Sequence, residues 1–173
     1  MEAQILLWIQ NNLRNDVLTP FLKVVTMLGN KGWFFILVSL ILLCLPKTRK
    51  TGLACALSLI LHLLAVNLCL KPLIFRARPY DVIPGLVNII EKQSDASFPS
   101  GHAAAAFAVT TVLLLRADKR LSIPMLVLSV IIAFSRLYVG VHYPTDVLAG
   151  VLIGVLFGVI SVWIVDKIGK KKI

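Results

Sequence analysis

Charged residues are scarce in this sequence, where they make up 15% of the 173 residues. Soluble proteins carry about 25%. Hydrophobic residues make up 58%, and the mean hydropathy is +0.90. So few polar groups cannot cover the surface of a compact domain, and lipid must therefore serve as part of its solvent. The composition excludes an ordinary soluble domain, and the length predicts a single membrane-embedded domain over residues 1–173.

Cysteine is also rare, and Cys44, Cys55 and Cys69 all lie within apolar stretches. An odd and scattered set provides neither a disulfide framework nor metal-ligand spacing, so we interpret these residues as packing residues. The first residues lack a basic start, and Gln10 interrupts the early apolar stretch. We therefore expect no signal peptide.

Acidic residues are few: 8 Asp and Glu stand against 18 Lys and Arg, a formal net charge of +10. Such a surplus is typical of nucleic-acid-binding proteins. Here, however, the charges gather between apolar stretches and do not form a stripe along a soluble domain. This pattern favours a membrane, and we predict membrane lipids, and no nucleic acid, as partners.

Uncharged stretches predict an all-α, polytopic membrane bundle with five spans. They cover residues 32–46, 51–70, 96–115, 121–135 and 147–165. A span needs about 20 mainly apolar residues, so the first and fourth stretches must borrow flanking residues. Residues 1–30 are expected to form interfacial or re-entrant helices, which could conceal a sixth span. The bundle then covers residues 32–166, and residues 167–173 form a basic cytoplasmic tail.

Basic residues between the spans indicate the orientation. Three segments that fall on one side hold ten of the 18 basic residues. These are Lys47, Arg49 and Lys50, then Arg116, Lys119 and Arg120, and finally Lys167, Lys170, Lys171 and Lys172. The positive-inside rule makes this side, with the C-terminus, cytoplasmic. Residues 71–98 and 136–146 then face the extracytoplasmic side of the cell membrane.

Three segments on this outer side carry ionisable groups at helix ends. They contribute the cations Lys71, Arg78 and Arg136, which could together cradle a phosphoryl group. Ser100 is a suitable N-cap for a helix that begins at Gly101, whose backbone N–H groups would face the same anion. The expected arrangement is an anion site built from side chains and a helix terminus.

Two histidines and a carboxylate accompany the cations. His142 and Asp146 are four residues apart, with Pro144 suited to a first helical turn, so we expect them on one helical face. The carboxylate could hold one imidazole nitrogen and leave the other as a nucleophile. His102, from another helix, could protonate the leaving oxygen. Together these residues predict phosphoryl transfer in two steps through a phosphohistidine.

Each of these residues also has an ordinary structural explanation when taken alone. A basic residue at the end of a span can extend to the lipid headgroups, and Asp146 could simply interact with a helix dipole. Six ionisable residues at three helix ends on one side of the membrane favour a site. By contrast, we interpret His62 as a contact between helices and Arg76 as a headgroup contact. Asn67, one turn before Lys71, could either orient Lys71 or form a contact between helices.

The three segments together resemble the type-2 phosphatidic acid phosphatase family. Its signature is Lys-x6-Arg-Pro, Pro-Ser-Gly-His and Ser-Arg-x5-His-x3-Asp, and the matching residues begin at Lys71, Pro99 and Ser135. The resemblance implies phosphate binding by Lys71, Arg78, Ser100, Gly101 and Arg136. It also implies His142 as nucleophile, Asp146 as its partner and His102 as acid, without a metal or other cofactor.

The resemblance further implies a lipid phosphate or pyrophosphate substrate, such as undecaprenyl pyrophosphate or phosphatidylglycerol phosphate. Many bacterial members have six spans, which leaves the N-terminal topology open. Two other functions remain possible from the residues. A phosphotransferase would pass the phosphoryl group from His142 to a lipid or sugar, whereas a small anion transporter would use the cations without chemistry. The transporter gives no reason for two histidines and a carboxylate beside the cations.

Overall fold

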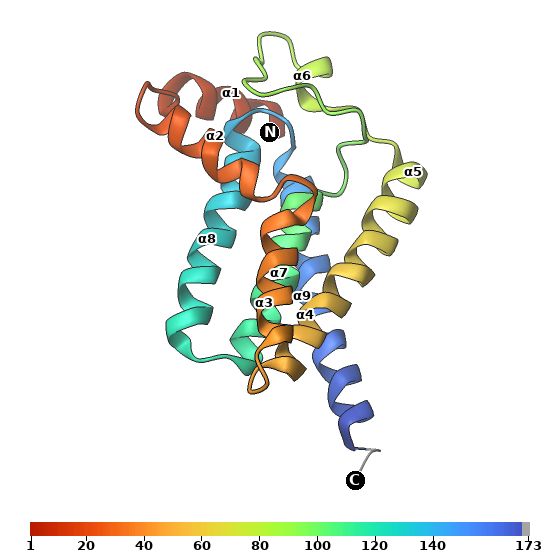
Figure 1. Ribbon diagram of the computed structural model, residues 1–173. Helices are drawn as coiled ribbons and strands as arrows, with labels where there is room; N and C mark the ends of the chain where they lie inside the picture. Colours follow the sequence, from red (N-terminus) through yellow and green to blue (C-terminus); the bar gives the residue numbers. More distant parts are fainter. Residues whose placement is uncertain (171–173) are drawn as a thin grey trace.

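The computed structural model describes residues 1–170, and within this range every regular element is a helix (Figure 1). The all-α expectation is therefore confirmed. The elements are α1 (Glu2–Leu13), α2 (Leu18–Leu28), the 3₁₀ helix η1 (Asn30–Gly32), α3 (Trp33–Cys44), α4 (Arg49–His62), the π-helix η2 (Leu63–Leu70), α5 (Lys71–Ile74), α6 (Pro79–Val82), α7 (Gly101–Arg116), α8 (Lys119–Tyr138) and α9 (Pro144–Lys170).

Each expected span coincides with a helix, but not every one of these helices is long enough to cross a membrane. Three helical stretches of the described chain are long and apolar enough: Arg49–Val82, Lys119–Tyr138 and Pro144–Gly169. A fourth forms if α2 and α3, which meet at a 46° bend, count as one span. Helix α7 is apolar but has only 16 residues. The five-span count and the single domain therefore stay predictions.

The sequence predicts interfacial or re-entrant helices at the start of the chain and a basic tail at its end. Helices α1 and α2 lie with α6 at one end of the bundle, the upper end in Figure 1. This arrangement suits interfacial helices, and the bend between α2 and α3 also suits a re-entrant segment. Residues 167–170 of the expected tail continue helix α9, and residues 171–173 lie outside the described part.

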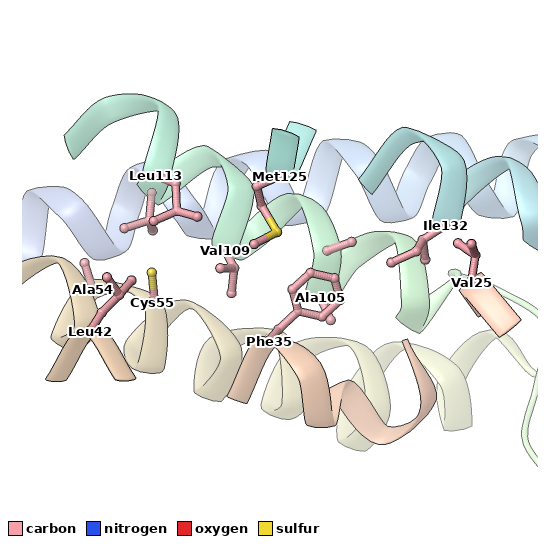
Figure 2. Close-up of a cluster of buried hydrophobic side chains, with 12 residues drawn as sticks. Val25, Phe35, Leu42, Ala54, Cys55, Ala105, Val109, Leu113, Met125 and Ile132 are labelled. Carbon is pink, nitrogen blue, oxygen red and sulfur yellow. The ribbon is translucent and has the colours of Figure 1, made fainter. Parts of the chain in front are cut away.

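Helix α7 lies at the centre of the bundle because its neighbours pack against it closely. Its Ala104 and Val109 are fully buried, and Figure 2 shows the core that residues of α7 form with Phe35, Met125 and Ile132. On α9, Gly154 faces α7 so closely that a Cβ there would lie 2.5 Å from the Ala104 carbonyl oxygen. Small residues at such spacing let two membrane helices approach.

The outer surface of the bundle is apolar. In the most apolar stretch of α9, 22% of the residues are buried, so most of its residues keep part of their surface outside the protein. Leu152 and Trp163 are examples of its exposed side chains. Exposed apolar side chains on this scale are unfavourable in water. The protein is therefore a membrane protein whose helices contact lipid.

The basic connections gather at the end of the bundle opposite α1, α2 and α6 (Figure 1). The α3–α4 and α7–α8 connections lie there with the C-terminal part of α9, and an ion pair joins Arg116 to Asp166. The expected grouping of these loops is thus confirmed. Which side of the membrane they face stays a prediction.

The contact between α7 and α9 yields a stability prediction. We expect Gly154→Ala to lower the free energy of unfolding in detergent by about 1–3 kcal/mol, since the added methyl group meets backbone that cannot move aside. Thermal unfolding of the purified protein measures the change. The control is Gly169→Ala on the same helix, where a Cβ meets only the flexible end of Lys50 at 3.4 Å. Equal stability of the two variants would contradict this packing argument.

Candidate active site

The expected site residues do come together, at the end of the bundle that carries α1, α2 and α6. Six of them line one cavity of about 630 Å³: Lys71, Arg78, Gly101, His102, Arg136 and His142. The other two, Ser100 and Asp146, are fully buried behind its wall. Residues separated by more than seventy positions thus share one cavity. Within residues 1–170 no group of three or more His, Cys, Asp or Glu side chains could hold a metal ion.

The ring of His142 has a defined orientation. Arg78 Nη1 lies 3.1 Å from His142 Nε2, and a guanidinium can only donate hydrogen bonds. Nε2 must therefore accept, which leaves its lone pair facing the cations and places the ring proton on Nδ1. Burial lowers the pKa of His142 well below its usual value, and the neighbouring cations, Arg78 first, lower it further. The ring is therefore neutral at neutral pH.

His142 and Asp146 lie close together, but not on one helical face as the sequence predicts. Asp146 lies in the first turn of α9, but His142 lies in the turn before that helix, so the two do not share a helical face. Pro144 begins the helix, as its fixed φ favours, and His142 is left outside. Its Nδ1 still lies 3.5 Å from Asp146 Oδ2. That contact is longer than a good hydrogen bond, but catalytic contacts often tighten only with substrate.

Asp146 is held by three donors that fix its carboxylate. Its Oδ2 accepts from the Tyr143 N–H at 2.9 Å and the Ser97 hydroxyl at 2.5 Å. The first of these is the helix-capping contact of a carboxylate that reaches back to the residue before its helix. Its Oδ1 accepts from Arg76 Nη1 at 2.6 Å. The carboxylate is therefore rigidly placed behind the His142 ring.

The interpretation of Arg76 as a headgroup contact is wrong. Besides Asp146, its guanidinium binds Glu2 Oε2 at 2.7 Å and lies over the Tyr143 ring, 3.8 Å from the centroid. Arg76 thereby ties the start of α1 to the start of α9. The sequence carries no signal for this role, because the partners are more than sixty residues away and pair only after the helices pack.

Asp95 is the main site residue that the sequence analysis missed. Its carboxylate forms ion pairs with Lys71 and, at 2.6 Å, with Arg78 Nη2, while Arg78 Nε donates to its backbone carbonyl at 3.0 Å. Burial alone would raise the pKa of Asp95, but the two cations outweigh it and hold that pKa below its usual value. Asp95 is thus a carboxylate anion lying between two of the three expected phosphate ligands.

Arg136 has far fewer partners than its burial demands. Only 1% of the residue is exposed, and its one side-chain hydrogen bond within residues 1–170 goes from Nη1 to the Thr26 hydroxyl at 2.5 Å. Its Nε has no partner in this part of the chain. A buried guanidinium is expensive unless an anion compensates it. Arg136 is therefore poised to bind an anion in the cavity.

The start of helix α7 closes the opposite wall. Ser100 is the N-cap, as expected, and its Oγ accepts from the Ala103 N–H at 3.5 Å. The Ser100 N–H donates to the Asp146 carbonyl at 3.0 Å, which joins the starts of α7 and α9. His102 follows on the cavity wall, with its Nε2 3.0 Å from Asn30 Oδ1. The helix terminus and His102 thus face the same space as the cations.

Known proteins resemble this chain in both sequence and fold. Residues 51–170 match the PAP2 superfamily. The chain is 33% identical over 143 residues to an undecaprenyl-diphosphatase of Sulfolobus acidocaldarius, covering 83% of this chain and 69% of that protein. It is 37% identical over 139 residues to a decaprenylphosphoryl-5-phosphoribose phosphatase of Mycobacterium tuberculosis, covering 80% and 72%. The crystal structure of Aquifex aeolicus LpxE superposes with a TM-score of 0.82 at 28% identity, covering 92% and 93%.

The position of Asp95 yields a binding prediction. We expect Asp95→Asn to tighten the binding of inorganic phosphate by roughly three- to tenfold, because the anion no longer competes with a charge-assisted contact to Lys71 and Arg78. Calorimetric titration of the purified protein measures the affinity. The control is Asp81→Asn, which removes an exposed carboxylate paired with Lys92 at 3.2 Å. Weaker binding by Asp95→Asn would mean that Asp95 organises the cations instead.

Proposed function

The chain belongs to the PAP2 superfamily, a family of phosphatases that act on lipid phosphates and pyrophosphates, and we propose that it hydrolyses such a lipid through a phosphohistidine at His142. One observation carries the proposal. The lone pair of His142 Nε2 accepts from Arg78 Nη1 within a buried cluster of cations at the end of a lipid-facing bundle, and a phosphoryl group that takes over the Arg78 donor would free it.

Binding comes first in the proposed mechanism. The phosphoryl group displaces the Asp95 carboxylate from Lys71 and Arg78 and also engages the free donors of Arg136. Its remaining oxygens meet the backbone N–H groups at the start of α7, where Ser100 and Gly101 lie and a helix terminus favours negative charge. The negative charges on the phosphoryl oxygens stabilise the buried cations, which burial shields from water.

The chemical steps assign a separate role to each of the two histidines that line the cavity. Arg78 Nη1 transfers its hydrogen bond from His142 Nε2 to a phosphoryl oxygen, and Nε2 attacks phosphorus. The bond from phosphorus to the leaving oxygen breaks, and His102, in its protonated form, gives its proton to that oxygen and becomes neutral. Asp146 stabilises the positive imidazole through the Nδ1 proton. A water molecule, deprotonated by His102, then attacks the same phosphorus. The nitrogen–phosphorus bond breaks, and inorganic phosphate leaves. The mechanism uses no metal.

The cavity supports a lipid substrate because its walls differ in character. Beyond the cations it is lined by Ile36 and Leu40 of α3 and by Leu59, Ile60 and Leu63 around the end of α4. A phosphate headgroup can lie among the cations while the apolar chain follows these residues towards the membrane. Undecaprenyl pyrophosphate and phosphatidylglycerol phosphate are the substrates we favour.

The orientation of the bundle supports an extracytoplasmic site. The basic connections lie at the end remote from the cavity, and the positive-inside rule assigns that end to the cytoplasm. The C-terminus is then cytoplasmic, and the phosphate-binding end contacts the outer leaflet.

The covalent step can be tested directly. We expect wild-type protein quenched during turnover of a lipid phosphate to carry an acid-labile phosphoryl group on His142, detectable by mass spectrometry. His142→Ala should carry none and release phosphate at least roughly a thousandfold more slowly. Lys92→Ala, which alters an exposed side chain outside the cavity, serves as the control. Full phosphate release by His142→Ala would refute the mechanism, and transfer to another lipid without phosphate release would indicate a phosphotransferase.

The orientation can be tested by cysteine labelling. In a background without the native cysteines, a membrane-impermeant maleimide applied to intact cells should label Lys92→Cys but not Lys119→Cys. Both variants should react after the membrane is permeabilised, because both side chains are exposed. The opposite pattern would place the site on the cytoplasmic side.

A further inference from the structure

A π-helix separates His62 from Lys71 and changes which residues share a face. In an α-helix a separation of nine positions corresponds to about two and a half turns, which would place the two side chains on opposite faces. The π-helix Leu63–Leu70 is wider and takes more residues per turn. Its effect is to turn His62 and Lys71 towards the same neighbour, the start of α7. Such π segments occur frequently at functional sites.

The polar atoms of this face converge beside Gly101. A Cβ at Gly101 would lie 3.5 Å from Asn67 Oδ1, 3.8 Å from His62 Nε2 and 3.9 Å from Lys71 Nζ. Three polar side chains from one helical segment therefore surround a single point at the N-terminus of α7. Glycine leaves that point open, whereas any other residue would fill part of it.

His62 is buried at this point, with only 8% of the residue exposed. Within residues 1–170 its Nε2 makes no well-formed hydrogen bond, although the ring lies close to the Gly101 backbone. A buried polar atom left unpaired costs about 1–3 kcal/mol, so the ring calls for a ligand in the cavity that it lines. The contact with a neighbouring helix that the sequence predicts for His62 is present at the Gly101 backbone of α7, but it leaves Nε2 without a well-formed hydrogen bond.

The location of His62 identifies what that ligand is. His62 adjoins Leu63 and is close to Ile60, both of which line the apolar part of the cavity, while its ring approaches Gly101 and Lys71. It therefore lies where the phosphate-binding end of the cavity meets the lipid-binding end. In a lipid diphosphate, the phosphoryl group attached to the lipid must occupy this boundary when the terminal group lies against His142.

We propose that His62 and Asn67 form a second phosphoryl subsite, which binds the lipid-attached phosphoryl group of a lipid diphosphate. The inference rests on the proposed function and names the substrate class. During the reaction the bond between the terminal phosphorus and the bridging oxygen breaks. The electron pair stays on the bridging oxygen, and the lipid monophosphate departs with His62 and Asn67 as its ligands. A lipid monophosphate has no second phosphoryl group and does not use the subsite.

The test compares two substrates in each variant. We expect His62→Leu to lower kcat/KM for a prenyl diphosphate at least about tenfold, and for the matching prenyl monophosphate less than about threefold. Turnover of the monophosphate also reports that the variant is folded. His62→Gln keeps a hydrogen-bond donor and should recover part of the loss. Asn67→Leu should shift the ratio in the same direction.

The control is Ser39→Ala, which should leave the ratio of kcat/KM for the two substrates unchanged. Ser39 lines the same cavity, but its hydroxyl donates to the Phe35 carbonyl of its own helix. Equal losses on both substrates in His62→Gln and Asn67→Leu, or no loss in either, would overturn the subsite. If the wild type released phosphate from neither lipid, the proposed function itself would be refuted.

Discussion

Three positive charges buried in one cavity are the constraint on which the rest of this structure depends. Lys71, Arg78 and Arg136 are each less than 10% exposed, and burying such charges without an anion costs several kcal/mol. Asp95 compensates two of them, while the side chain of Arg136 has only the Thr26 hydroxyl as a partner in the described part of the chain. A phosphoryl group, with its charge spread over several oxygens, is suited to all three cations.

The close packing of α7 on α9 puts the other components opposite these cations. Because Gly154 allows the two helices to approach, their N-termini meet, and the Ser100 N–H reaches the Asp146 carbonyl. The positive ends of two helix dipoles then face the same end of the molecule. Asp146, held at the start of α9, lies behind the ring of His142. The scaffold and the site are therefore parts of one arrangement.

The cavity joins two environments that the proposed function requires together. Its cationic end suits phosphate, its apolar end between α3 and α4 suits a lipid chain, and His62 lies at the boundary. Asp95 neutralises part of the charge on Lys71 and Arg78 until substrate arrives. In this view two side chains outside the motif residues adjust the site: the half-exposed Asp95 competes with phosphate for the cations, and the buried His62 affects which phosphorylated lipid is preferred.

The sequence by itself determined the helices and the motif residues, because apolar length, N-caps and helix-starting prolines act locally. It also determined which helix ends carry cations. Only the tertiary structure decided that Asp95 pairs with Lys71, that Arg76 holds Asp146, and that His142 lies before α9. Those pairings join residues far apart in the chain, and packing alone brings them together. The π-helix before Lys71 is also a feature that only the tertiary structure decided. Its hydrophobic sequence is like that of any membrane span, and only its contacts with α7 show which way its polar side chains face.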